Sequence, residues 1–364
     1  MSHIVIDARE LRTTSGRYIE RLLHYLQKID DQHDYTVLLT SKDIDDWEPT
    51  NPRFHKVETS YKEFTFGEQL GFLKQINSLK ADLVFFPFVQ QPIGYRGKVV
   101  TTIQDLTTLR FYNPAKNKLV FTVKQKIYGQ VIKHAVRHSD RVITPTKFVR
   151  DDVIAYTKAN PAKFVVTYEA ADAITDKATP IKALKGRQFI MYVGRPQPHK
   201  NLSRLIDAFG ILKESHPKLT LVLAGKKETL FDRHEQEVAN KGIADVIFTD
   251  FVSEGELRWL YENTAAYIFP TLSEGFGLPG LEAALAGAPV VASNASCIPE
   301  VYGKGAHYFD PLDVPDMARQ ISKVLDDASF RATLASAGLK QAQKYSWERM
   351  AQQTLDVFNT TLDA

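Results

Sequence analysis

The sequence predicts an α/β protein with two doubly wound, Rossmann-like parallel-sheet domains that face each other across a cleft. Three observations predict this fold. The chain has 364 residues, more than a single hydrophobic core usually supports. Short apolar, β-rich runs alternate with helical patterns, which is typical of parallel strands joined by helical crossovers. The alternation lapses once, in a polar stretch at residues 171–186, so this stretch is expected to be the linker.

The first domain is expected at residues 1–170. Its helical periodicity is clearest at Gly16–Ile29, where Tyr18 and Leu22 share an apolar face, and it recurs at Val149–Tyr156. The apolar runs predict strands at His3–Ile6, Tyr35–Thr40, Leu83–Phe86, Val99–Ile103, Arg141–Thr144 and Lys163–Thr167.

The second domain is expected at residues 187–345. Its predicted strands are Phe189–Val193, Leu219–Ala224, Val246–Phe248, Ala266–Phe269 and Pro289–Ser293. Its predicted helices are Leu202–Glu214, Phe231–Lys241, Glu256–Asn263 and Pro279–Ala286. Residues 346–364 form a separate last segment, in which Trp347–Leu362 has an amphipathic pattern and is expected to cross back to the first domain.

Composition narrows the functional class. With 44% hydrophobic residues, 24% charged residues and a net charge of +3, the chain resembles ordinary soluble proteins and gives no indication of nucleic-acid binding. The single cysteine, Cys297, excludes an intrachain disulfide and is expected to be a small apolar residue. No leader pattern precedes the first strand, and no apolar window suits a membrane span. We therefore expect a cytoplasmic protein.

The run Ser273–Glu282 is the most informative segment of the chain. It follows a predicted strand, contains three glycines, and leads into a helix with a proline near its first turn. Backbone N–H groups at such a glycine-rich helix N-terminus can approach an anion closely. The carboxylates Glu274 and Glu282 flank this anion site and can accept hydrogen bonds from hydroxyls. A nucleotide sugar, with central phosphates and hydroxyls at both ends, fits this arrangement.

A second segment, Val193–Leu202, also joins a strand to a helix. Arg195 and Lys200 lie on this loop, where a guanidinium and an ammonium group can both face a diphosphate. Two cations five residues apart are more often solvated surface residues. Their place at the carboxyl end of a strand, in the same domain as the paired glutamates, favours the binding role.

These motifs resemble those of the retaining glycosyltransferases of family 4. The resemblance includes Gly194-Arg195, Lys200-Asn201 and Ile298-Pro-Glu-Val301, besides the run Ser273–Glu282. It extends through nearly the whole chain and is closest in character to mannosyltransferases of polysaccharide assembly. It implies a GT-B fold, a nucleotide-sugar donor, and a glycan or lipid-linked acceptor.

The resemblance also implies residue roles. Glu282 would accept hydrogen bonds from the ribose and Glu274 from the donor sugar, while Arg195 and Lys200 would neutralise the diphosphate. The remaining donor contacts would come from Gly16, Val252, Gly275, Phe276, Gly277 and Leu278. A cationic clamp of this kind can replace a divalent metal, so no metal or other cofactor is expected.

One position departs from the family pattern. Family members commonly carry His-Asp after the strand that corresponds to Val99–Ile103, whereas this chain has Gln104-Asp105. The family histidine approaches the donor sugar near the reacting carbon. Glutamine can hydrogen-bond there but cannot act as a general base. The change puts the sugar identity and the rate in question, and Gln104 can alternatively be a simple loop cap.

Two further segments carry charged residues that could bind a ligand. Asp43-Ile44-Asp45 is the only Asp-x-Asp sequence and is interpreted as a solvated loop rather than a metal site. Residues 116–141 hold seven Lys or Arg and one acid, Asp140, interleaved with apolar residues. This segment predicts either a crossover helix packed on the sheet, which we favour, or peripheral contact with the inner face of an anionic membrane.

Other functional classes stay open from sequence. Gly275-Phe-Gly-Leu-Pro-Gly280 satisfies the Gly-x-Gly-x-x-Gly fingerprint of NAD-linked oxidoreductases, but the next strand ends at Ser293-Asn294 with no acidic residue for a ribose. An epimerase or phosphorylase of the same architecture, or a non-catalytic nucleotide-sugar-binding protein, would also carry this site.

Overall fold

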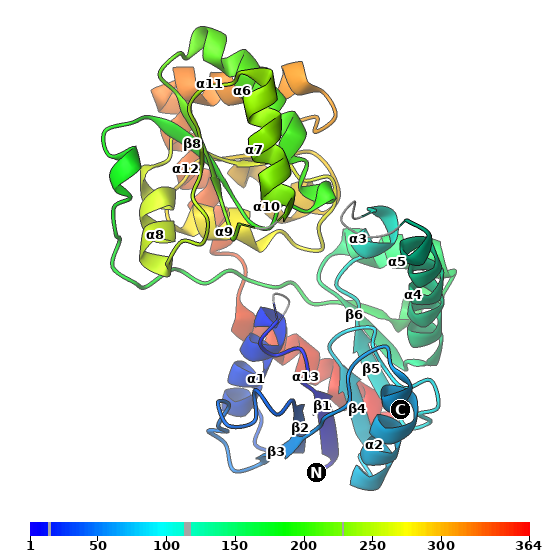
Figure 1. Ribbon diagram of the computed structural model, residues 1–364. Coiled ribbons are helices and arrows are strands. Elements are labelled where there is room, and N and C mark those ends of the chain that lie inside the picture. Colours follow the sequence, from blue (N-terminus) through cyan, green and yellow to red (C-terminus); the bar gives the residue numbers. More distant parts are fainter. Residues whose placement is uncertain (14–15, 113–117, 228) are drawn as a thin grey trace. The chain divides into compact units, whose positions relative to one another are not determined.

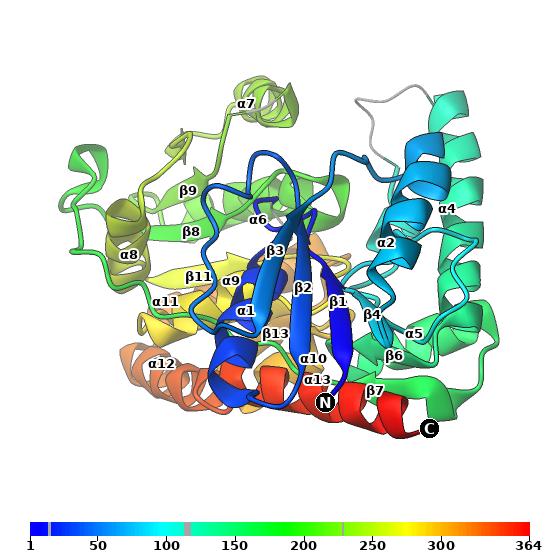
Figure 2. The same ribbon diagram turned by 90° about the horizontal axis from the view of Figure 1, so that it is seen from below.

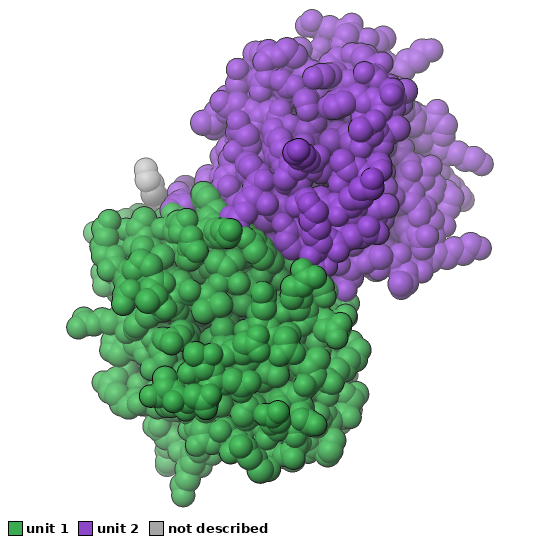
Figure 3. Space-filling view, turned by 180° about the vertical axis from the view of Figure 1, so that it is seen from behind, with its two compact units in different colours: residues 1–109, 122–169, 346–364 green, residues 110–121, 170–345 purple. Residues whose placement is uncertain are grey.

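The computed structural model describes residues 1–13, 16–112, 118–227 and 229–364, without the side chains of residues 118–120. The chain divides into two compact units, which Figure 3 shows in different colours. Unit 1 comprises Met1–Leu109, Thr122–Glu169 and Ser346–Ala364, and unit 2 comprises Arg110–Phe121 and Ala170–Tyr345. The last segment of the chain thus groups with the first half. Arg110–Phe121, which the sequence assigned to the first domain, groups with unit 2.

Unit 1 contains a seven-stranded, all-parallel sheet with the order β3-β2-β1-β4-β5-β6-β7 (Figure 1). The sequence order reverses between β1 and β4, which are neighbours in the sheet. The strands are β1 His3–Asp7, β2 Asp34–Leu39, β3 Phe54–Glu58, β4 Leu83–Phe86, β5 Val99–Thr102, β6 Arg141–Thr144 and β7 Phe164–Val166.

The helices of unit 1 cover this sheet. They are α1 Arg17–Ile29, the π-helix η1 Glu68–Phe72, α2 Leu73–Leu79, α3 Thr107–Arg110, α4 Lys118–His138, α5 Lys147–Thr157, the 3₁₀ turn η2 Pro161–Lys163 and α13 Trp347–Asp363. The last helix, α13, packs on α1 and contacts the central strands of the sheet (Figure 2). Its buried Trp347, Met350 and Phe358 supply the apolar face that its periodicity predicts.

Unit 2 contains a six-stranded parallel sheet with the order β10-β9-β8-β11-β12-β13. Its strands are β8 Phe189–Val193, β9 Thr220–Ala224, β10 Val246–Phe248, β11 Ala266–Phe269, β12 Val290–Ser293 and β13 Ala306–Phe309. Its helices are α6 Leu202–Ser215, α7 Thr229–Lys241, α8 Glu254–Asn263, α9 Leu278–Leu285, α10 Ile298–Tyr302, α11 Val314–Asp326 and α12 Ala328–Ala342, with the 3₁₀ turns η3 Lys182–Leu184, η4 Pro198–Lys200 and η5 Gly303–Gly305. Two parallel-sheet α/β domains are confirmed.

The central strands form because their residues are apolar throughout. In β8, four of the five residues are buried, as expected for a parallel strand covered by helices on both faces. The strands absent from the sequence prediction, β3 and β13, are both at a sheet edge. There β3 carries His55, Lys56 and Glu58, because an edge strand tolerates charge that a central strand does not.

Candidate functional site

The predicted binding motifs lie at the switch point of the unit 2 sheet. β8 and β11 are hydrogen-bonded neighbours, and the chain reverses its direction of winding between them. The loop at residues 194–201 follows β8, and the turn at residues 270–277 follows β11. Both therefore leave the carboxyl ends of adjacent strands, which is where open α/β sheets bind ligands.

Asn201 joins these two loops. It adopts a left-handed conformation with φ of 61°, and its amide nitrogen donates hydrogen bonds to the carbonyls of Pro270, at 3.0 Å, and Pro311, at 2.8 Å. Its amide oxygen accepts a hydrogen bond from Arg204 at 2.8 Å. The side chain is buried, so these bonds hold the 194–201 loop rigidly beside the turn after β11.

The structure brings Lys200 and Glu274, both predicted site residues, into direct contact. The Lys200 ammonium donates to Glu274 Oε1 at 2.6 Å, and both side chains are mostly buried, with exposures of 16% and 12%. The same ammonium lies 5.7 Å from the centre of the Phe269 ring. An ammonium group has three donors, and this ion pair uses one of them. The pair therefore presents a fixed cation and a fixed acceptor at the switch point.

His199 precedes the ion pair and is held neutral. Burial and, to a smaller extent, the adjacent Lys200 lower its pKa to about 4, while Glu274 opposes the shift. Its backbone carbonyl accepts hydrogen bonds from Leu272 N at 2.7 Å and from Thr271 Oγ1 at 3.2 Å. Because the His199 imidazole is neutral, the positive charge of these two neighbouring residues lies on Lys200. Sequence reasoning missed His199, although its place beside Lys200 on the loop was visible.

The glycine-rich turn leads into α9 as its sequence predicts. Gly277 has φ of 90° at the N-cap, a conformation that favours glycine, and its carbonyl accepts a hydrogen bond from Tyr302 at 2.5 Å. A Cβ at Gly280 would overlap the Tyr302 ring. Glu274 N donates to Ser296 Oγ at 3.0 Å. The turn is thus held from the α10 side, and the first N–H groups of α9 lie next to Glu274 in the chain.

The remaining unit 2 residues lie around this turn. Arg195 is exposed on the loop after β8, and Tyr192 donates a hydrogen bond to its carbonyl at 3.3 Å. Glu282 is partly buried, one turn into α9. Gly275 and Phe276 belong to the glycine-rich turn itself, and Leu278 is the first residue of α9. Val252 is partly buried and precedes Ser253, which caps α8 through a capping box. The binding roles of these residues stay predictions.

In unit 1, Gln104 lies beside a buried acid that sequence reasoning missed. Burial raises the pKa of Glu169 to about 7, and the charges of Arg17 and Asp105 act in opposite directions on it. The Gln104 amide faces this carboxyl and offsets part of the shift, although its Nε2 makes no standard hydrogen bond to the residues described. Gln104 therefore has a neighbour within its own unit, and its role toward a ligand stays a prediction.

Gly16 has a structural reason to be glycine. A Cβ at this position would overlap the backbone carbonyl of Leu11. Its backbone conformation is ordinary, with φ of −70°, so close packing rather than a special dihedral angle requires the missing side chain. The proposed approach to a ligand stays a prediction.

The interpretation of Asp43-Ile44-Asp45 as a solvated loop holds for the exposed Asp45 but is wrong for Asp43. Asp43 is 4% exposed, accepts a hydrogen bond from Thr40 at 2.7 Å and pairs with Arg12 at 3.5 Å. It is therefore a buried turn residue rather than a solvated one. Its carboxylate accepts a hydrogen bond within the turn that follows β2. The burial of this side chain could not be predicted from the sequence alone, because it depends on the fold.

Comparison with known proteins identifies the domain type. Residues 175–341 match the family described as glycosyl transferases group 1. Unit 2 contains a group 1 glycosyltransferase domain. The O-antigen chain mannosyltransferase B of Escherichia coli is 29% identical over 244 residues, which are 66% of this chain and 60% of that protein. The serotype-specific mannosyltransferase WbdA of Escherichia coli is 30% identical over 67% of this chain and 29% of that protein. The chain thus spans less than two thirds of either relative.

Solved structures show the same fold over the whole chain. Sucrose-phosphate synthase from Thermosynechococcus elongatus matches with a TM-score of 0.77 at 16% identity, covering 99% of both chains. Anabaena Alr3699/HepE in complex with UDP and glucose matches with a TM-score of 0.72 at 17% identity, covering 99% of this chain and 100% of that one. The expected GT-B glycosyltransferase fold is confirmed.

Proposed function

We propose that this protein is a metal-independent, retaining hexosyltransferase. It would move a hexose from a nucleoside-diphosphate sugar, of the GDP-mannose or UDP-sugar type, to a glycan or lipid-linked acceptor. The observation that carries the proposal is the Lys200–Glu274 pair, at 2.6 Å, beside the N-terminus of α9 at the unit 2 switch point. The two mannosyltransferase relatives and the UDP complex of HepE support the class of reaction and of donor.

The charges at this site suit the bond that is broken. Cleavage of a sugar–phosphate bond builds negative charge on the diphosphate and positive charge on the sugar. Lys200, Arg195 and the first N–H groups of α9 would stabilise the leaving diphosphate. Glu274 would orient the sugar through a hydroxyl, and Glu282 would hold the ribose. In a retaining reaction on one face of the sugar, the departing phosphate can accept the proton of the acceptor.

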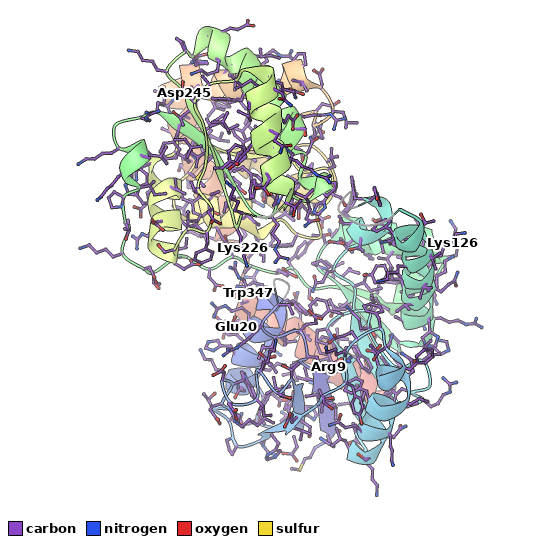
Figure 4. All side chains as sticks on the ribbon, viewed as in Figure 1. Arg9, Glu20, Lys126, Lys226, Asp245 and Trp347 are labelled. Atoms are coloured by element: carbon purple, nitrogen blue, oxygen red, sulfur yellow. The ribbon has the colours of Figure 1, made fainter. Side chains whose placement is uncertain are left out.

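Residues of unit 1 are proposed to act on the acceptor side of the reaction. Gln104 would replace the family histidine near the sugar, as a hydrogen-bonding group that does not titrate. The exposed Lys124 and Lys126 on α4 (Figure 4 labels Lys126) would contact an anionic membrane surface if the acceptor is lipid-linked. No described helix is long and apolar enough to cross a bilayer. Flotation with anionic vesicles at two salt concentrations tests this contact, because such binding weakens with salt.

A donor panel with and without acceptor tests the function. The protein is incubated with GDP-mannose, UDP-glucose and related donors, in the presence of a chelator, and released nucleoside diphosphate is measured. Acceptor-dependent release with a product of unchanged anomeric configuration is expected. Loss of release on chelation would contradict metal independence. Donor binding without release would identify a binding protein, and release of sugar phosphate or an altered nucleotide sugar would identify a phosphorylase or an epimerase.

A further inference from the structure

A buried tyrosine on helix α10 reaches the glycine-rich turn. Tyr302 is the last residue of α10 (Figure 1) and is 2% exposed, and its hydroxyl donates a hydrogen bond to the Gly277 carbonyl at 2.5 Å. Burial raises the pKa of this hydroxyl well above its ordinary value, and the nearby charge of Glu274 raises it further. Tyr302 therefore stays protonated, and its hydroxyl remains a hydrogen-bond donor throughout the neutral pH range.

Gly280 provides the space for this contact. A Cβ at Gly280 would lie 2.2 Å from the Tyr302 hydroxyl oxygen and 2.5 Å from the ring carbon that carries it. Gly280 belongs to helix α9 and has no positive φ, so its dihedral angles do not require glycine. Because glycine weakens a helix relative to alanine, the approach of Tyr302 is the physical reason for a glycine at this position.

The hydrogen bond to Gly277 fixes the direction of the next backbone donor. The Gly277 carbonyl and the Leu278 N–H belong to the same trans peptide unit, so they point in opposite directions. Tyr302 holds the carbonyl toward α10, and the Leu278 N–H is therefore directed away from α10. Since a carbonyl oxygen accepts two hydrogen bonds, the tyrosine adds to the bond that an N-cap carbonyl accepts within its own helix.

The Leu278 N–H is important because the next residue has no N–H. Leu278 and Pro279 are the first two residues of α9, and proline lacks a backbone donor. These two positions therefore offer a single N–H to an anion at the helix N-terminus. Gly277 has φ of 90° and no Cβ, so without a second anchor its peptide unit can rotate more freely than one that follows another residue. A rotated unit would present a carbonyl oxygen, which repels an anion.

We propose that Tyr302 is a positioning residue of the donor site, because its hydroxyl keeps the Leu278 N–H directed at the diphosphate. The inference rests on the proposed transferase function for the identity of the anion as a nucleoside diphosphate. Tyr302 acts through the backbone of the turn and does not touch the ligand itself. The hydroxyl thus contributes to anion binding as well as to the stability of unit 2, and these two contributions can be measured separately.

Tyr302→Phe tests the proposal because it removes the hydroxyl and keeps the ring. Affinity for GDP and for UDP is measured by titration calorimetry of the full chain, and stability is measured by urea unfolding. We expect Tyr302→Phe to bind the preferred nucleotide about tenfold more weakly, the loss typical of one hydrogen bond to a charged group. Gly280→Ala should cause a similar loss, because its added Cβ displaces the same hydroxyl.

The direction of the Leu278 N–H provides a second measurement that needs no ligand. Residual dipolar couplings in NMR report the orientation of a backbone N–H bond relative to the rest of its domain. We expect the wild-type coupling at Leu278 to agree with the direction in the structure and to change in Tyr302→Phe. An unchanged coupling in Tyr302→Phe would overturn the proposal, even if the wild type binds nucleotides.

Tyr308→Phe is the matched control. Tyr308 donates a hydrogen bond at 2.6 Å to the carbonyl of Gly303, the residue that follows α10, so the substitution removes a similar bond from the same helix end. We expect stability to fall as in Tyr302→Phe, while the nucleotide affinity and the Leu278 coupling stay as in the wild type. Wild-type affinity in Tyr302→Phe, or equal affinity losses in the two variants, would overturn the proposal. Failure of the wild type to bind either nucleotide would contradict the proposed transferase function instead, while the coupling measured without ligand still decides whether Tyr302 orients the peptide.

Discussion

Replacement of Lys200 by methionine is expected to destabilise unit 2 as well as to impair its function. Lys200 and Glu274 are 2.6 Å apart. Coulomb attraction at this distance is about 6 kcal/mol at an effective dielectric constant of about 20, and desolvation cancels most of it. Removal of Lys200 leaves Glu274, which is 12% exposed, as a buried charge without its cation. We expect Lys200→Met and Glu274→Gln each to lower the free energy of unfolding by about 2–3 kcal/mol.

A double-mutant cycle separates the pair from its surroundings. The Lys200→Met/Glu274→Gln protein leaves neither charge uncompensated, so its loss should be close to that of one single variant. The resulting coupling energy is about 2 kcal/mol. Arg258 and Glu262 provide a matched control pair at 2.7 Å, but both side chains are 36% exposed. The same cycle there should give less than about 0.5 kcal/mol.

The measurement is urea unfolding of all variants, repeated with a nucleoside diphosphate present. If Lys200 contacts the diphosphate, the ligand should stabilise the wild type and the Glu274→Gln protein but stabilise Lys200→Met much less. Additive effects of the two single substitutions would refute the energetic argument. Equal ligand stabilisation with and without Lys200 would refute its contact with the diphosphate.

Three further substitutions test other residues. Glu282→Ala should weaken donor binding by about tenfold or more in calorimetry, since a carboxylate that holds two hydroxyls is lost, whereas unchanged affinity would contradict the ribose role. Gln104→His should raise the turnover of one donor many-fold if the glutamine marks an altered sugar site, and equal turnover of all donors would favour the loop-cap interpretation. Burial raises the pKa of Glu169 from 4.5 to about 7 in the folded protein. The free energy of unfolding of the wild type should therefore fall as the pH rises from 4.5 to about 7. Glu169→Gln should abolish this loss, a relative gain of up to about 3 kcal/mol by urea unfolding at pH 8, and a pH-independent difference would contradict it.

The fold was largely predictable because hydrophobic pattern and strand order follow simple rules. Buried central strands such as β8 and β11 consist of apolar residues, and their boundaries agree with the prediction within about a residue. The edge strands β3 and β13 were not predicted, because solvent on one side of an edge strand permits polar residues such as Lys56 and His307. The grouping of Arg110–Phe121 with unit 2 depends on tertiary contacts that no local pattern encodes.

The site was predictable where loops follow neighbouring strands, and less so where partners are distant in sequence. Lys200 and Glu274 were selected from their positions after two strands, but their direct contact depends on β8 and β11 being neighbours. The ion-pair cluster around Arg9 in unit 1 was missed because its acid Glu68 lies 59 residues away. The sequence did offer one indication of this cluster, because the polar residues Asp7 and Arg9 stand at the end of a buried strand.

The two switch points differ in charge in a way that suggests a division of roles. Both sheets share the same winding, and in each the loops after two central strands carry the polar residues. In unit 1, Arg9 is buried and pairs with three carboxylates, Asp7, Glu63 and Glu68, so its charge is not available to an anionic ligand. In unit 2, Lys200 pairs with one carboxylate, and Arg195 is exposed on the same loop. An anionic diphosphate is therefore favoured at the switch point of unit 2 rather than at that of unit 1.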